Sequence, residues 1–304
     1  MITTGVCMVC GQAGKPWLDG IKDYLLLQGN SPDFDVCCCA SCKIAYSMPS
    51  MTNEDLAQYY PKEYGPYVPK KSMDGFLQRV KYKSDLALIR KYRGSRGGTL
   101  FEIGAGRGEF LHQARTAGFE VGGLEPSEAG VRIARDFYEI RLETNFMDDF
   151  NFSSPHDCVV VRHVLEHLND PMGCLNKIFQ HGLKPQGVLL LKLPRLDSWE
   201  AHFWGKFWSG FDMPRHRVHF TREGILKILR QVGFREIKIY QEMIPVDFLR
   251  DARYYAMHGK PGLLKKMTQI FTALPLFIQL MIASCVGMLL FPFGPARMII
   301  LARK

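Results

Sequence analysis

The stretch Thr99-Leu-Phe-Glu-Ile-Gly-Ala-Gly-Arg-Gly-Glu109 decides how the rest of the chain is organised. Its apolar first half predicts a buried strand, and glycines follow at alternate positions, Gly104, Gly106 and Gly108. Glycine lets the backbone turn sharply and lets a ligand approach without a Cβ in the way. We expect a helix to begin after the last glycine, with free N–H groups in its first turn. The stretch therefore predicts a strand, a ligand-binding turn and a helix.

Two acidic residues frame this turn. Glu102 lies two places before the first glycine, and Phe119-Glu-Val-Gly-Gly-Leu-Glu125 predicts a second strand that ends in a carboxylate. A carboxylate at that position can accept both hydroxyls of a ribose. The third glycine comes one residue earlier than in the dinucleotide pattern G-x-G-x-x-G. The strand, turn, helix, strand and terminal acid together are stronger evidence than a glycine turn alone.

This pattern resembles the class I S-adenosylmethionine-dependent methyltransferases. Glu102 and the three glycines match the first motif of that family, and Glu125 matches the second. Three later stretches also match: the fourth strand at 157–161, the turn after it at 164–171 and the fifth strand with its lead-in at 183–191. The resemblance implies a Rossmann-like α/β fold with a seven-stranded mixed sheet and S-adenosylmethionine as the cofactor.

The resemblance also implies where the cofactor binds, because ligands of open α/β sheets lie beyond the carboxyl ends of the strands. The expected cofactor-binding residues are Glu102, Gly104, Ala105, Gly106, Gly108, Glu125, Pro126, Asp148, Arg162 and His163. Asp148 stands where the family usually has an acid that accepts from the adenine amino group. Asp149 and a simple solvated loop acid remain alternatives at that position.

The stretch His163-Val-Leu-Glu-His167 has several interpretations. Positions i, i+3 and i+4 share a helix face, so His163, Glu166 and His167 can converge on a divalent metal. The spacing also fits an inverted zinc-peptidase motif, but similar Leu-Glu-His turns follow the fourth strand in methyltransferase relatives, some of which bind a divalent ion. Glu166 can instead fix the loop through a hydrogen bond. We expect His167 to act as the general base.

Between Asp197 and Thr221, aromatic and basic side chains gather on predicted loops, where binding groups tend to lie. We expect Arg215 and His219 to bind the substrate, since an arginine fork suits a carboxylate or phosphate. His216 is the second candidate for the catalytic base.

Two cysteine pairs, Cys7-x-x-Cys10 and Cys39-x-x-Cys42, begin the chain. Two such pairs give a tetrahedral thiolate site for Zn²⁺, and four thiolates leave no open position, so its role would be structural. Free thiols and disulfides are the alternatives, and the expected cytosolic setting disfavours disulfides. Many bacterial methyltransferases carry a similar front end, so the resemblance implies a zinc-ribbon-like module.

Composition limits the class of protein. The 304 residues are 47% hydrophobic and 23% charged, which is typical of a globular chain and excludes a disordered one. The net charge of +9 indicates an anionic partner, either nucleic acid or a membrane surface. Residues 243–304 hold eight bases and two acids, which is most of that excess. The first residues lack the regions of a signal peptide, so we expect no export.

A long insertion separates the last two predicted strands, which the fold would otherwise join almost directly. Residues 271–293 carry no charged side chain, a length that makes them a transmembrane candidate. The final strand, 297–302, must return to the sheet, so we expect a re-entrant hairpin or in-plane helices, with the flanking bases on anionic headgroups. Packing on protein, or in an oligomer interface, is the alternative.

The expected organisation has five parts: a zinc-ribbon-like module at 1–58, a linker at 59–72, the methyltransferase core at 73–242, the apolar helical insertion at 243–295 and the last core strand at 296–304. We expect a cytoplasmic enzyme, peripheral or monotopic at the inner face of the membrane. Its acceptor would be a lipid-linked, glycan or natural-product-like small molecule methylated on oxygen or carbon.

Two other functions remain open. An RNA methyltransferase that uses the zinc module would bind RNA with steep salt dependence. Nucleic acid is the less favoured partner, because the bases gather around the apolar segment and not in an aromatic-basic stripe. A non-catalytic scaffold that retains the fold would not bind the cofactor, and the intact motif residues argue against it.

Overall fold

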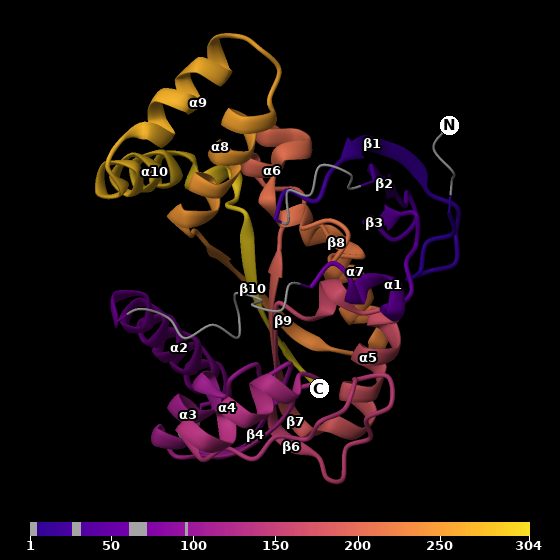
Figure 1. The fold of residues 1–304 in the computed structure, drawn as a ribbon. Helices are drawn as coiled ribbons and strands as arrows, with labels where there is room; N and C mark the ends of the chain where they lie inside the picture. Colours follow the sequence, from indigo (N-terminus) through magenta and orange to yellow (C-terminus); the bar gives the residue numbers. More distant parts are fainter. Residues whose placement is uncertain (1–4, 26–31, 61–71, 95–96) are drawn as a thin grey trace.

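A six-stranded mixed sheet forms the centre of the molecule (Figure 1). The computed structural model describes residues 5–25, 32–60, 72–94 and 97–304. The strand order in this part of the chain is β5-β4-β6-β7-β10-β9. The bounds are β4 Gly98–Ile103, β5 Phe119–Leu124, β6 His156–Arg162, β7 Leu183–Pro194, β9 Arg235–Glu242 and β10 Arg297–Arg303. β10 runs antiparallel to both of its neighbours, β7 and β9, while the other pairs that include β4 or β6 are parallel.

This sheet has the Rossmann-like methyltransferase topology that the sequence predicts, with one strand fewer. Where a seventh strand would extend the edge beyond β5, the described chain makes a single parallel bridge between Leu124 and Glu143. The residues around that bridge, from Arg141 to Phe146, are mostly exposed and polar. A solvated edge of this kind lacks the apolar face that would hold a full strand against the core.

Two layers of helices cover the sheet. On one face, α2, α3 and α4 pack against strand side chains such as Leu100 and Val160. On the other face, α5 and α7 pack against Phe101 and Val161, the next residues along the same strands. Successive strand residues point to opposite faces, so continuous apolar runs are required here. The helix bounds are α2 Ser72–Arg93, α3 Glu109–Thr116, α4 Glu128–Tyr138, α5 Pro171–Lys177 and α7 Arg222–Val232.

A second, four-stranded sheet has the order β1-β2-β3-β8. β1 (Lys15–Ile21), β2 (Phe34–Cys38) and β3 (Ile44–Met48) come from the front of the chain, with the short helix α1 (Asn53–Ala57) after them. β8 (Val218–Phe220) comes from the segment that follows β7 and pairs antiparallel with β3. The predicted boundary near residue 58 therefore separates stretches of sequence that share one sheet. Most of the predicted linker, 59–72, lies outside the described residues.

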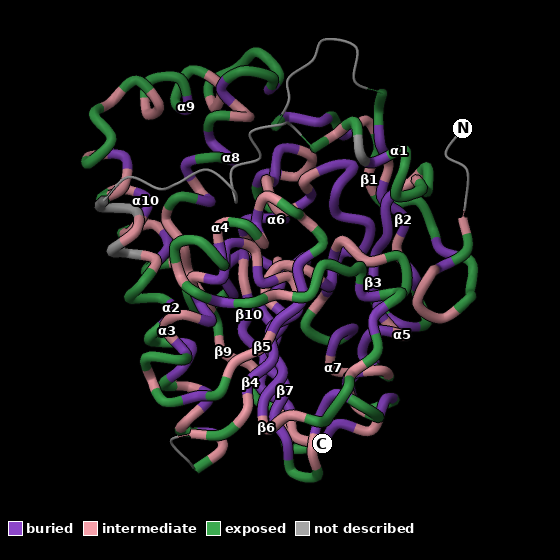
Figure 2. The backbone as a smooth tube through the Cα atoms, turned by 60° about the horizontal axis from the view of Figure 1, so that its bottom comes forward, coloured by how far each residue is buried: buried purple, intermediate pink, exposed green. Residues whose placement is uncertain are grey.

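The insertion before the last strand is helical. It comprises α8 (Pro245–His258), α9 (Leu263–Ala273), α10 (Leu276–Leu290) and the 3₁₀ turn Phe291–Phe293. α9 and α10 lie together at one end of the molecule, and α9 is largely exposed (Figures 1 and 2). In the described part of the chain, Leu276–Phe293 is the one helical stretch long and apolar enough to cross a membrane, and 17% of it is buried.

Candidate active site

The glycine turn joins β4 to α3, and each of its three glycines has a positive φ. A Cβ on Gly104 would lie 2.3 Å from Val164, and a Cβ on Gly108 would lie 2.9 Å from Ala134. At Gly106, with φ +56°, a Cβ would meet nothing within 4 Å. Gly104 and Gly108 therefore permit close packing, whereas Gly106 leaves open space beside the backbone.

Glu125 follows β5 and turns its carboxylate towards this space. Its Oε2 accepts a hydrogen bond from the backbone N–H of Gly106 at 2.7 Å, and its Oε1 accepts one from the N–H of Ser127 at 2.9 Å. The side chain is only 3% exposed. A carboxylate oxygen can accept more than one hydrogen bond, so these contacts are compatible with ribose hydroxyls as further donors.

Glu102 is fully buried on β4 and is paired with Arg162 at the end of the neighbouring strand β6. Arg162 donates to Glu102 Oε1 from Nε at 2.9 Å and from Nη2 at 2.6 Å. The guanidinium lies over the rings of Phe110 and Tyr82. Burial raises the pKa of Glu102, and the charge of Arg162 opposes that rise. The pair fixes Arg162 at the carboxyl end of the sheet.

A cavity of about 680 Å³ lies at this end of the sheet. Of the predicted cofactor and catalytic residues, those that line it are Gly104, Ala105, Gly106, Glu125, Pro126, Arg162, His163, His167 and His216. Glu102 and Gly108 lie behind the lining, where Glu102 holds Arg162 and Gly108 begins α3. Its volume falls within the range of about 300–1,000 Å³ that is usual for small-molecule sites.

His163 is the first residue after β6 and has a positive φ of 55°. Its Nε2 lies 3.1 Å from Nη1 of Arg297, which Asp247 binds through both carboxylate oxygens at 2.5 and 2.7 Å. Arginine can only donate, so Nε2 accepts and the proton of the neutral imidazole is on Nδ1. Burial and the charge of Arg297 hold the pKa of His163 well below its usual value. The Nδ1 atom faces Glu166 Oε1 at 3.5 Å.

His167 and His216 lie against each other, with ring centroids 4.6 Å apart. Their Nδ1 atoms lie 3.1 and 2.8 Å from the backbone carbonyls of Arg215 and Gly210. A carbonyl only accepts, so each Nδ1 carries the proton and each Nε2 keeps a lone pair. Burial lowers the pKa of both rings, that of His167 to about 3. Asp212 Oδ2, 3.9 Å from Nε2 of His216, opposes the fall for His216.

Glu166 completes this group. It is 1% exposed, neither carboxylate oxygen has a hydrogen-bond partner among the described residues, and burial raises its pKa to about 8. Ligand atoms of Glu166, His167 and His216 lie within 4.8 Å of one another, which suits a divalent metal. From an α-helical spacing, the sequence predicted His163, and not His216, as the third ligand beside Glu166 and His167. The segment forms a 3₁₀ turn, Leu165–His167, so His216 from a distant loop takes that place.

Comparison with known proteins identifies the family. A family model described as a methyltransferase domain matches residues 73–239, more than half of the chain. The chain belongs to this methyltransferase family. It is an S-adenosylmethionine-dependent methyltransferase of class I. None of the curated proteins compared with the chain matches it.

Two of the solved structures that are similar to the methyltransferase serve as examples. One is an S-adenosylmethionine-dependent methyltransferase from Thermotoga maritima, described as a possible histamine N-methyltransferase. The two sequences are 18% identical, the TM-score is 0.49, and the match covers 76% of this chain and 93% of the other. Another is the N-methyltransferase NodS from Bradyrhizobium japonicum, in complex with S-adenosyl-L-homocysteine, with 13% identity and a TM-score of 0.45, covering 74% and 86%.

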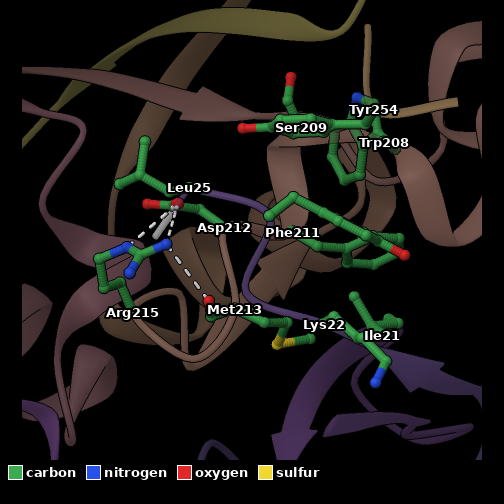
Figure 3. A pocket seen from close by; sticks show the side chains of 11 residues that line it. Ile21, Lys22, Leu25, Trp208, Ser209, Phe211, Asp212, Met213, Arg215 and Tyr254 are labelled. Atoms are coloured by element: carbon green, nitrogen blue, oxygen red, sulfur yellow. Dashed lines mark hydrogen bonds and ion pairs between the residues drawn. The ribbon is translucent and has the colours of Figure 1, made fainter. Parts of the chain in front are cut away.

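Arg215 lies in a different position from the predicted one. Its guanidinium is 1% exposed and donates to both oxygens of Asp23 at 2.8 and 3.0 Å, to Asp212 at 2.8 Å and to the carbonyl of Tyr59 at 2.9 Å. Figure 3 shows it directed at Asp212 and at the Met213 carbonyl. Because these partners occupy the N–H donors of the guanidinium, it cannot also bind a substrate. In the methyltransferase, Arg215 joins the front of the chain to the loop that carries His216.

His219 and Asp148 also lie away from the cavity lining. His219 is buried on β8, with Nε2 3.0 Å from the hydroxyl of Ser47 on β3. It therefore stabilises the second sheet, and the predicted substrate contact does not fit this geometry. Asp148 is exposed in the turn at 147–149, where Lys177 donates to its carbonyl. Its predicted role at the adenine stays a prediction.

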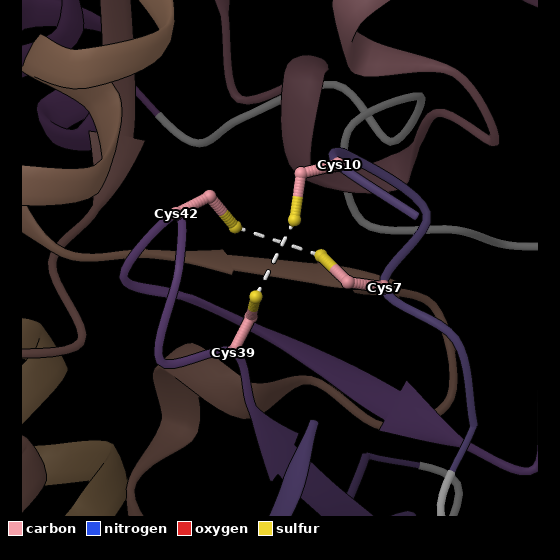
Figure 4. Close-up of side chains that lie close together, drawn as sticks. All are labelled: Cys7, Cys10, Cys39 and Cys42. Atoms are coloured by element: carbon pink, nitrogen blue, oxygen red, sulfur yellow. Dashed lines mark hydrogen bonds between the residues drawn. The ribbon is translucent and has the colours of Figure 1, made fainter. Parts of the chain in front are cut away.

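The four predicted zinc ligands of the methyltransferase converge. The Sγ atoms of Cys7 and Cys42 are 3.6 Å apart, those of Cys10 and Cys39 are 3.4 Å apart, and all four lie within 4.8 Å of one another. Figure 4 shows the sulfurs pointing at a common centre. Zn–S bonds of about 2.3 Å in a tetrahedron require sulfurs separated by about 3.8 Å. The cluster therefore fits one zinc ion.

The sequence did not indicate the cavity residues that come from the insertion and from the strand after it. They are Asp247, Arg250 and Tyr254 from α8, Arg297 at the start of β10 and Ala296 just before it. The one feature of the sequence that could have indicated these residues was the presence of charged side chains at both ends of the insertion. Asp247 and Arg297 are 50 residues apart in sequence, and only the return of β10 to the sheet brings them together.

Proposed function

We propose that this methyltransferase works at a membrane surface and methylates an oxygen or carbon of a lipid-linked or other small-molecule acceptor. One observation supports the catalytic part. The same cavity is lined by Gly106 and Glu125 and by His167 and His216. The first pair would hold the nucleoside of S-adenosylmethionine, and the second pair would face the acceptor.

S-adenosylmethionine supplies an electrophilic methyl group when it is bound. Methyl transfer requires an in-line approach, so alignment and exclusion of water supply much of the rate. His216 is the better placed base in this proposal. The Asp212 carboxylate at 3.9 Å stabilises its protonated form and is the largest influence on its pKa after burial. For His167, burial and the charge of His216 outweigh the same carboxylate and lower the pKa to about 3. The Nε2 atom of His216 would remove the acceptor proton, and His167 would orient the acceptor.

The membrane part of the proposal is supported by an apolar surface. Large side chains of α9 and α10 are between 56% and 76% exposed: Leu263, Met267, Ile270, Leu276, Phe277, Met281, Met288 and Leu289. We call this surface the α9–α10 patch. Exposed apolar patches of this kind mark interaction sites, and Lys260, Lys265 and Lys266 beside it suit anionic headgroups.

The topology supports one way for the patch to meet a bilayer. Arg297 at the start of β10 pairs directly with Glu242 at the end of β9. The two ends of the insertion therefore lie side by side on the same sheet. A single crossing of the membrane by α10 would put these two ends on opposite sides of the bilayer. Helices that lie in the interface of one leaflet satisfy this constraint. We propose that the enzyme lies at the cytoplasmic face of the membrane.

Flotation with lipid vesicles tests the proposal. The wild-type chain should float with vesicles of phosphatidylcholine and phosphatidylglycerol and be partly released by high salt. The double variant Met288→Ser, Leu289→Ser should lose most of this binding. Phe137→Ser is the matched control, because Phe137 is 77% exposed on α4, outside the patch. Equal binding by the three proteins, or no binding by the wild type, would show that the patch does not meet lipid.

A further inference from the structure

α8 is the element through which the cavity meets the α9–α10 patch. Its residues Asp247, Arg250 and Tyr254 line the cavity. The same helix packs against α9, where the rings of Phe248 and Phe271 lie 6.0 Å apart, and against α10. α8 therefore offers a route along which a molecule could place its reactive end in the cavity and its apolar tail in the bilayer.

Arg250 differs from the other cations of the cavity lining. Arg107, Arg162 and Arg297 each make an ion pair with a carboxylate, namely Glu109, Glu102 and Asp247. Arg250 is exposed, and within the part of the chain that the structure describes it makes no such pair. The adjacent Asp251 is fully buried and accepts from the backbone N–H of Ser209 instead. The guanidinium at the cavity is thus available for an anion.

Tyr254 lies one turn further along α8, on the same helix face as Arg250. Burial raises its pKa to about 12, so the hydroxyl keeps its proton at neutral pH and can donate a hydrogen bond. An arginine fork and a hydroxyl donor on one helix face match phosphate oxygens, which arginine binds in a bidentate manner.

We propose that Arg250, with Tyr254 on the same helix face, recognises a phosphate group placed between the apolar tail and the methyl-accepting end of a lipid-linked acceptor. This inference rests on the proposed membrane function. The position of α8, between an apolar surface and a polar cavity, is where the headgroup phosphate of such a molecule would lie.

Calorimetric titration of the full chain, saturated with S-adenosylhomocysteine, tests the inference with three probes: farnesyl diphosphate, farnesol and inorganic pyrophosphate. Farnesyl diphosphate should bind more tightly than either of the others. Arg250→Ala should weaken that binding at least tenfold and leave farnesol binding within twofold. Arg253→Ala is the matched control, since Arg253 is an exposed arginine of the same helix that does not line the cavity. It should change no affinity by more than twofold.

Three results would overturn the inference. Equal losses in Arg250→Ala and Arg253→Ala would indicate general electrostatic attraction. Farnesol binding as tight as farnesyl diphosphate would show that the phosphate is not recognised, and pyrophosphate binding as tight would indicate a water-soluble phosphate and not a lipid. Failure of all three probes, with S-adenosylhomocysteine binding and vesicle flotation intact, would reject this inference alone. Loss of those two activities in the wild type would instead reject the proposed function.

Discussion

The carboxylate of Glu125 accepts a hydrogen bond from the backbone N–H of Gly106 at 2.7 Å. This contact joins the ends of two parallel strands, because Gly106 follows β4 and Glu125 follows β5. It orients the carboxylate over the one glycine of the turn whose Cβ position is open. The arrangement therefore holds a hydrogen-bond acceptor and a stretch of bare backbone at the same point of the cavity.

Gly106→Ala should weaken S-adenosylhomocysteine binding at least tenfold. The added methyl would occupy the open space beside the turn, and φ at +56° is unfavourable for alanine by about 1–2 kcal/mol. Gly118→Ala is the control, because Gly118 also has a positive φ with nothing near its Cβ position but does not line the cavity. Both variants should lose similar stability on chemical denaturation. Equal affinity in the two variants would show that Gly106 does not approach the cofactor.

Removal of one cluster cysteine should release zinc. The wild-type chain should hold about one zinc ion per molecule by elemental analysis, and Cys39→Ser should hold almost none and unfold at a lower temperature, since structural zinc contributes directly to folding. Cys285→Ser should resemble the wild type, because Cys285 is exposed on α10, outside the cluster. A fully folded wild-type protein without zinc after expression with the metal present would contradict the assignment.

The sequence predicted well where neighbouring residues determine the structure. The glycine turn, the buried strands and the two cysteine pairs are local patterns, and each forms the expected element. Prediction was weaker where distant segments meet. Arg215 has the chemistry of a substrate ligand, but its partner Asp23 is 192 residues away and takes the guanidinium out of reach. His216 joins Glu166 and His167 for the same reason, through a contact that no spacing in the sequence indicates.

Glu200 should make stability depend on pH. Burial on α6 (Trp199–Trp204) raises its pKa to about 7, whereas an unfolded glutamate ionises near 4.3. The folded state therefore keeps the proton over a range where the unfolded state loses it. The free energy of unfolding should fall as the pH rises from about 4.3 to about 7, by about 4 kcal/mol from this group, and then level off. Glu200→Gln should remove that part of the slope in urea denaturation. Glu223→Gln, which changes an exposed residue of α7, is the control and should show the same pH dependence as the wild type. The same pH dependence in all three proteins would contradict a raised pKa of Glu200.

His216→Asn should lower methyl transfer by about a hundredfold, the lower end of the range for a lost general base, while S-adenosylhomocysteine binding stays within twofold. The measurement follows labelled methyl groups from S-adenosylmethionine into a lipid extract and, separately, into total RNA. His202→Asn is the control, because His202 is an exposed histidine of α6 that does not line the cavity.

Wild-type activity should appear in the lipid fraction. Its rate should rise with pH as His216 loses its proton, and the His216→Asn variant should lack this pH dependence. Label in RNA alone would favour the rival nucleic-acid substrate. Unchanged transfer by His216→Asn would move the role of base to His167, whose Nε2 lone pair lies in the same cavity.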